Sequence, residues 1–122
     1  MDANVEFQID FFERVYKKDT ENSDVIELLG NLYTQNGRIK DGLRMDLKHV
    51  KVEPQNPFAH YNLACSHALS KHKDRAFESL EKAIDLGYRD AEWMEQDPDL
   101  KSLKQDKHFR ELIKRLKQKT DQ

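Results

Sequence analysis

The chain has 122 residues, a formal net charge of −2, a charged fraction of 36% and an apolar fraction of 37%. This length fits one small domain, and the apolar share is low for a globule but too high for a disordered tail. The near-neutral charge argues against a dedicated nucleic-acid binder, which usually carries a strong basic excess.

Cysteine content and apolar runs bear on the compartment. A single cysteine, Cys65, excludes an intrachain disulfide, so nothing requires an oxidising environment. No apolar run approaches the roughly 20 residues that cross a bilayer, and residues 1–6 lack the pattern of a signal peptide. We therefore expect a cytoplasmic protein without a membrane partner, and the small number of glycines and prolines favours helices.

Helical spacing of apolar residues begins at residues 8–22, which we expect to form one helix. Its apolar stripe consists of Ile9, Phe12, Val15 and Tyr16. A second helix has apolar residues at positions 25, 26, 29, 32 and 33, and Asn36-Gly37 ends it because glycine accepts left-handed backbone. A third helix is expected over Ile39–Val52.

A second pair of helices is expected over residues 57–86. Asn56 has the side chain of an N-cap, and Pro57 suits the first helical position. The pair bends at residues 71–73 and stops at Gly87, and a short helix over residues 91–96 follows. Asp97-Pro98 then starts a turn, and Asp106 is expected to cap a last helix. The apolar stripe of that last helix consists of Phe109, Leu112, Ile113 and Leu116.

A shift of 34 residues aligns the two pairs of helices with each other. Residues of the same class then coincide: Leu29 with Leu63, Gly30 with Ala64, Asn36 with Ser70, Gly42 with Ala76 and Asn22 with Asn56. The repeating unit is therefore a helix–turn–helix of 34 residues.

This unit resembles the tetratricopeptide repeat (TPR) family, whose pattern has a Leu-Gly pair, then an aromatic, small residues in the second helix and a closing proline. The matching residues are Leu29-Gly30, Leu63-Ala64, Tyr33, Gly42, Ala76, Ala83 and Pro54. His67 stands in an aromatic position, and His49 departs from a small one, which predicts altered packing at the end of the first repeat. Residues 91–122 resemble the closing segment of bacterial TPR arrays, so a bacterial protein is expected.

The resemblance implies an all-α fold: a short α-solenoid of antiparallel helix hairpins, forming a TPR-like right-handed superhelix with a C-terminal helical cap. The single domain, 1–122, would comprise an N-terminal half repeat (1–22), two repeats (23–56 and 57–90) and the cap (91–122). Because the half repeat lacks its first helix, two interpretations stay open. The chain is part of a longer array, or this helix is itself an N-terminal cap.

The function that the resemblance implies is non-catalytic binding of a peptide or helix of a partner protein in a concave groove. The family's geometry gives a lining of Asp24, Glu27, Leu28, Asn31, Gln35, Phe58, Tyr61, Asn62, Cys65 and Leu69. Phe58 and Tyr61 are expected to form an exposed aromatic anchor, and the two asparagines to hydrogen-bond an extended peptide. The acidic residues favour a neutral or basic ligand. Burial of Leu28, Leu69 and Cys65 against neighbouring helices or the cap is the alternative.

A structural role is the second hypothesis, because the unpaired N-terminal helix could pack on a second copy as a homodimer. The chain could also be the terminal part of a longer scaffold. The clamp by which chaperone-binding TPR members hold the C-terminal carboxylate of heat-shock proteins is incomplete. Asn31 and Asn62 occupy its asparagine positions, but Glu27, Glu92 and Gln96 replace its cations. We therefore expect no binding of a heat-shock tail, because like charges repel.

Other chemistries are disfavoured. The set His60, Cys65, His67 and His72 could offer zinc ligands, but two of its histidines stand at packing positions, so no metal or cofactor is expected. No Gly-rich phosphate loop or catalytic arrangement stands out, so an enzyme is not expected. Residues 99–119 contain eight basic and three acidic side chains, which we interpret as a solvated helix face rather than a nucleic-acid patch.

Overall fold

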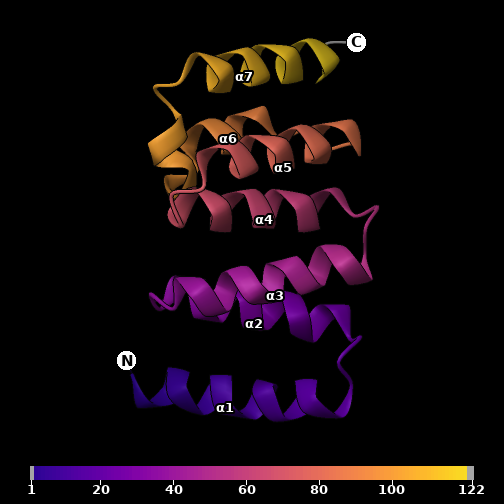
Figure 1. Ribbon diagram of the computed structural model, residues 1–122, viewed down its shortest axis with the longest axis vertical. Helices are drawn as coiled ribbons and strands as arrows, with labels where there is room; N and C mark the ends of the chain where they lie inside the picture. The colour runs from indigo at the N-terminus through magenta and orange to yellow at the C-terminus, as the bar shows by residue number, and fades with distance from the viewer. Residues whose placement is uncertain (1, 121–122) are drawn as a thin grey trace.

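The computed structural model describes residues 2–120. Its elements are α1 (Ala3–Lys18), α2 (Ser23–Gln35), α3 (Ile39–Val52), α4 (Pro57–Leu69), α5 (Lys73–Asp85), α6 (Ala91–Gln96), the 3-10 helix η1 (Pro98–Leu103) and α7 (Lys107–Thr120). The helices stack along the long axis of the molecule, with α1 at one end and α7 at the other (Figure 1). The fold is an all-α solenoid, as the repeat predicted.

Asparagine side chains cap the starts of α2 and α4, whereas α3 and α5 begin without a side-chain cap. The Asn22 carboxamide oxygen accepts the Val25 N–H at 3.2 Å, and that of Asn56 accepts the Phe58 N–H at 2.9 Å. These bonds satisfy backbone donors that the first helical turn leaves without a partner. Helices α2 and α4 therefore begin at equivalent places in the two repeats.

The turn inside each hairpin repeats with the same geometry. Arg38 N donates to Tyr33 O, and His72 N donates to His67 O, both at 2.8 Å. Left-handed backbone precedes each of these donors, with φ of 82° at Gly37 and 63° at Lys71. The repeat thus keeps the turn even where a lysine replaces the glycine that accepts this conformation without strain.

Small residues let helices α2 and α3 approach closely. A Cβ on Gly42 would overlap the Thr34 hydroxyl and lie 3.3 Å from the Gly30 carbonyl oxygen. A Cβ on Gly30 would lie 2.7 Å from Asp46 Oδ1, so this glycine leaves the space that the Asp46 carboxylate occupies. The predicted departure at His49 is accommodated, because its ring is buried and Nε2 lies 2.8 Å from Glu53 Oε1.

The apolar core consists of two clusters. The N-terminal cluster joins α1, α2 and α3 and contains Ile9, Val25, Ile26, Leu29, Tyr33 and Met45. The C-terminal cluster runs from α4 to α7 and includes the predicted stripe of the last helix together with Met94, Leu100 and Leu103. The segment from α6 to α7 therefore closes the stack by covering apolar side chains of α4 and α5. Among the described residues, no helix combines the length and apolar character needed to cross a membrane.

Candidate binding cleft

A cleft of about 170 Å³ lies among α2, α3, α4, α6 and the turn that enters η1. Its lining residues are Asn31, Thr34, Asp46, Tyr61, Asn62, Cys65, Ser66, Trp93, Asp97 and Asp99. Four of them, Asn31, Tyr61, Asn62 and Cys65, were predicted from the sequence as part of a groove. The structure thus brings these four together with six residues that the sequence analysis did not assign.

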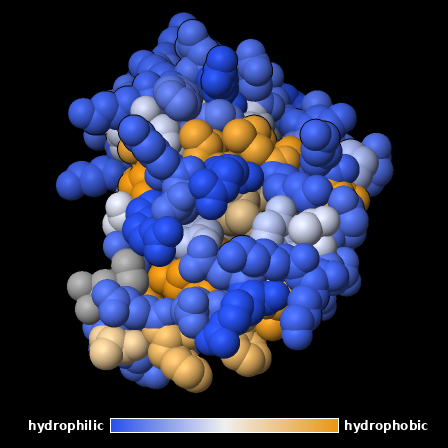
Figure 2. Space-filling view, turned by 60° about the horizontal axis from the view of Figure 1, so that its bottom comes forward, coloured by the Kyte–Doolittle hydropathy of each residue, from blue (hydrophilic) through white to orange (hydrophobic). Residues whose placement is uncertain are grey.

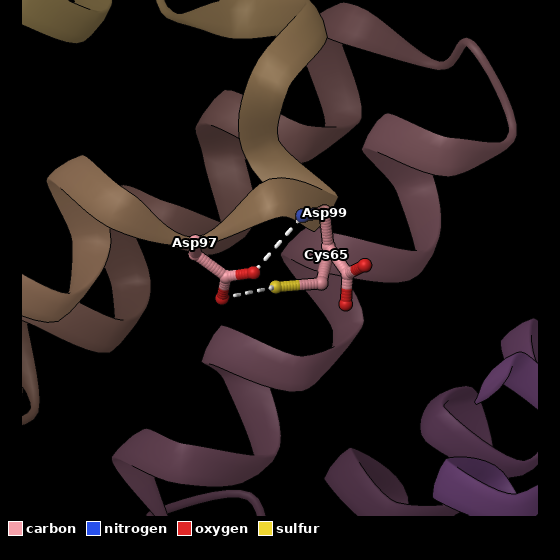
Figure 3. Close-up of side chains that lie close together, drawn as sticks. All are labelled: Cys65, Asp97 and Asp99. Atoms are coloured by element: carbon pink, nitrogen blue, oxygen red, sulfur yellow. Dashed lines mark hydrogen bonds between the residues drawn. The ribbon is translucent and has the colours of Figure 1, made fainter.

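Asp97 connects the closing segment to α4. Its Oδ1 accepts the Asp99 N–H at 3.0 Å and so caps η1. Its Oδ2 accepts the Tyr61 hydroxyl at 2.6 Å and the Cys65 thiol at 3.6 Å. Figure 3 shows the Cys65 sulfur pointing at the Asp97 carboxylate, with Asp99 beside it. Asp97, only 4% exposed, therefore satisfies polar groups from two elements that are far apart in the sequence.

The predicted exposed pair of Phe58 and Tyr61 is wrong for Tyr61. Its ring is buried and stacks on Tyr88 with centroids 4.4 Å apart, because the closing segment covers this part of α4. Burial raises the pKa of the Tyr61 hydroxyl, and its hydrogen bond to the Asp97 carboxylate acts in the same direction. Phe58 is 61% exposed and meets the edge of Tyr88, so it remains the available aromatic group.

Cys65 is buried, which agrees with the alternative that the cap covers it. Burial raises the pKa of its thiol, and the neighbouring Asp97 charge raises it further. A thiol in this environment stays protonated, and the thiolate is the form that acts as a nucleophile. Cys65 therefore acts as a small buried donor to Asp97.

The four candidate zinc ligands do not converge. His60 Nε2 lies 2.8 Å from the Pro54 carbonyl oxygen, and His67 Nδ1 lies 3.2 Å from His72 Nδ1, while the Cys65 thiol faces Asp97. In residues 2–120 a different group does converge: one ligand atom each of Cys65, Asp97 and Asp99 lie within 4.8 Å of one another.

Asp46 and Asp99, two carboxylates of the cleft, have raised pKa values. Asp46 is 4% exposed and accepts the Ser66 hydroxyl at 2.5 Å. Burial raises its pKa to about 6, although this hydrogen bond and His49 oppose the rise. The pKa of Asp99 is also raised, by burial and then by the charge of Asp97. Both carboxylates therefore lie where a negative charge is poorly stabilised.

The remaining predicted groove residues lie outside the cleft. Asp24, Leu28 and Gln35 are exposed on α2, and Leu69 is half-buried at the end of α4. Leu28 and Leu69 are therefore not fully covered, in contrast to Cys65. The Glu27 carboxylate lies 3.9 Å from His49 Nε2. The resemblance to the repeat family placed the expected groove on α2 and α4, and both helices contribute residues to this cleft. Residues of the closing segment complete its lining.

The basic side chains near the C-terminus partly pair with acidic residues of neighbouring elements. Arg115 contacts Asp85 at 2.5 Å, Lys117 contacts Glu95 at 2.6 Å, and Lys73 of α5 pairs with Asp106 at the start of α7. These contacts are partly exposed, so each contributes little to stability. They agree with the interpretation of α7 as a charged, solvated face.

Comparison with known proteins establishes the kind of fold. The chain matches the crystal structure of MamA with a TM-score of 0.76 and 21% identity, covering 98% of this chain and 73% of that one. A second MamA crystal structure gives 0.75 and 23%, covering 94% and 65%. The fold is TPR-like. A third structure, MamA MSR-1 C2, gives 0.72 and 18%, covering 97% and 70%.

One curated protein is also similar in sequence. A chloroplastic protein from Arabidopsis thaliana is 26% identical over 109 residues, which is 87% of this chain and 32% of that protein. The chain thus spans about a third of the length of this relative. No family model matches the chain.

Proposed function

We propose that this protein is a non-catalytic interaction module that holds a segment of a partner protein against the cleft. The observation that carries this proposal is the combination of an exposed indole with free amides. Trp93 is 48% exposed at the edge of the cleft, and Asn31 and Asn62 line it from α2 and α4. An exposed aromatic ring supplies contact area, and a carboxamide can both donate to and accept from an extended backbone.

The shape of the site supports a peptide rather than a cofactor. A cavity of about 170 Å³ is smaller than the roughly 300 to 1,000 Å³ typical of small-molecule sites. Phe58, outside the cleft on the first turn of α4, offers further apolar area to a segment that extends along this face. The acidic lining also supports the expectation that a heat-shock tail, which ends in a carboxylate, does not bind.

Changes in the cleft are expected to weaken partner binding. Random peptides displayed on phage would be selected on the wild-type protein, and the dissociation constant of the enriched peptides measured by fluorescence anisotropy. We expect Trp93→Ala and Asn62→Ala to raise it by about tenfold or more, because anchor residues near the centre of an interface dominate its energy. Leu47→Ala, on the exposed face of α3, is the control and leaves it unchanged. Equal binding by all four proteins would contradict the proposal.

A second candidate function is self-association through α1. Phe7 and Phe11 are one helical turn apart and are 65% and 47% exposed. Figure 2, which brings the α1 end forward, shows apolar side chains gathered at that edge of the molecule. Large exposed aromatic residues on one helix face are unusual for a free surface, and a twofold contact would cover both copies with one patch.

This second candidate predicts a dimer that dissociates when negative charge is added to α1. In light scattering at high protein concentration, the wild type is expected at twice the monomer mass. Phe7→Glu with Phe11→Glu returns it to the monomer mass, because burying four added carboxylates across the contact is unfavourable. Leu47→Glu serves as a control for an exposed apolar residue elsewhere. A wild type that stays monomeric would exclude this candidate and leave the cleft proposal intact.

A further inference from the structure

The cleft carries an uncompensated negative charge. Asp46, Asp97 and Asp99 all line it, and its lining contains no lysine, arginine or histidine. Within residues 2–120, none of these three carboxylates forms an ion pair, whereas Asp41, Asp85 and Glu95 elsewhere each do. Buried charges in proteins are normally paired. His49, which opposes the rise in the pKa of Asp46, lies outside the lining, so the lining itself supplies no cationic side chain.

The two oxygens of Asp46 are used unequally. Oδ2 accepts the Ser66 hydroxyl, but Oδ1 accepts no hydrogen bond from the described residues, although the side chain is 96% buried (4% exposed). The Asp99 carboxylate likewise accepts no hydrogen bond there. Asp97 differs, since its oxygens already accept bonds from Tyr61, Cys65 and Asp99. Asp99 therefore has free acceptor capacity in the cleft, and Asp46 adds the charge of a carboxylate whose Oδ1 packs against Gly30.

Trp93 provides the second attraction for a cation. An indole face attracts lysine and arginine side chains through its quadrupole, and this attraction grows when the pair is partly desolvated. The cleft is also small, about 170 Å³, which suits the end of one long side chain better than a whole helix. A carboxylate and an aromatic face together fit a guanidinium or ammonium group.

We propose that the partner segment inserts one positively charged side chain, from arginine or lysine, into this cleft. Its charge lies against the carboxylates of Asp46 and Asp99, and its stem or guanidinium plane lies against the Trp93 indole. This inference rests on the proposed function, and it names the chemical class of the residue that the site recognises. It places the basic ligand group at the cap, away from the Asp24 and Glu27 positions expected from the sequence.

A metal ion is a less suitable occupant. Cys65, Asp97 and Asp99 lie close enough to share one, but a cysteine ligand must be deprotonated, and burial raises the pKa of this thiol. Coordination would also displace the hydrogen bonds that Asp97 accepts from Tyr61 and Cys65. A cationic side chain leaves these bonds in place.

The test uses Trp93, the single tryptophan of the chain, as a fluorescent reporter inside the site. Peptides enriched by display would be synthesised in matched pairs, with arginine against citrulline and lysine against acetyl-lysine at the basic position that the peptides share. Each pair keeps nearly the same shape and differs in charge. We expect the neutral member to bind at least tenfold more weakly, with a change in Trp93 emission for the charged member that salt reduces.

Variants assign the charge preference to the cleft. Asp99→Asn and Asp46→Asn are each expected to lower the ratio between charged and neutral peptides several-fold. Glu92→Gln removes the same charge beside Trp93 but outside the cleft lining, and it is expected to keep the ratio. A change in the ratio only in Glu92→Gln would assign the preference to the surface and overturn the inference.

The outcomes separate this inference from the function on which it rests. If peptides bind but citrulline and arginine bind equally, the inference is wrong and the interaction module stands. If no peptide binds and Trp93 emission never changes, both are wrong. If zinc alone changes the Trp93 emission and Asp99→Asn abolishes that change, the cleft is a metal site and the inference is overturned.

Discussion

Replacing Asp97 with alanine is expected to lower the free energy of unfolding by about 3 kcal/mol, the largest effect of any single change at the cleft. The substitution removes the cap of η1 and leaves the buried Tyr61 hydroxyl and Cys65 thiol without their acceptor. Relief of the repulsion between Asp97 and Asp99 offsets part of this loss. The change in the free energy of unfolding is measured by urea unfolding, followed by Trp93 fluorescence and by circular dichroism.

A double-mutant cycle with Tyr61→Phe identifies the contact responsible. In the wild type, this change removes a buried hydroxyl that donates to Asp97 and is expected to destabilise the protein. In the Asp97→Ala background, the same change removes a donor without a partner and should cost little or stabilise. The coupling between the two positions is expected at about 1 to 2 kcal/mol. Additive effects, or an Asp97→Ala protein as stable as the wild type, would refute the assigned role.

Replacing Asp46 with asparagine is expected to stabilise the protein by about 2 kcal/mol at pH 7.5. Burial raises the pKa of Asp46 to about 6, above its ordinary value of 3.8. A rise of about two units corresponds to about 3 kcal/mol, and the amide of asparagine recovers most of it because it is neutral and nearly the same shape. The Ser66 hydroxyl can still donate to the amide oxygen.

The sign of the pH dependence follows from proton binding. Between about pH 4 and pH 6 the folded protein binds more protons at Asp46 than the unfolded chain, so stability falls as the pH rises. The destabilisation is complete above that window and absent below it. The difference in the free energy of unfolding between Asp46→Asn and the wild type should therefore be largest above pH 7 and vanish near pH 4. Comparing the two proteins removes the contributions of the other titrating groups.

Ser66→Ala supplies a control for this interpretation. Because the Ser66 hydrogen bond lowers the pKa of Asp46, removing the hydroxyl should move the window to higher pH. Guanidinium unfolding of all three proteins across pH 4 to 8 gives the profiles. If the difference in the free energy of unfolding between Asp46→Asn and the wild type stays constant across this pH range, the charge of Asp46 is not the cause of the destabilisation.

Local sequence signals were sufficient to predict most of the fold. Asn56-Pro57 predicted the start of α4, and the observed bounds of α3 agree with the expected Ile39–Val52. The small residue Gly42 indicated a close approach of two helices. In the structure, a larger residue at this position of α3 would overlap the Thr34 hydroxyl of α2. Each of these signals acts within one hairpin, where spacing along the chain and spacing in the structure are simply related.

The cleft was only partly predictable because it is a contact between distant segments. Tyr61 and Asp97 are 36 positions apart, and helical periodicity does not tell which face of α4 the closing segment covers. One signal was nevertheless present, because Asp97-Pro98 indicated the start of a turn.

We expect the division of the core into two clusters to give the chain two cooperative units. No residue belongs to both clusters, and a boundary runs between α3 and α4. Amide hydrogens of the N-terminal unit can therefore exchange with solvent while the C-terminal unit stays folded. The cleft crosses this boundary, since Asn31 and Asp46 belong to the first unit and Trp93 to the second. A ligand that fills the cleft thus links the two units and slows exchange in both.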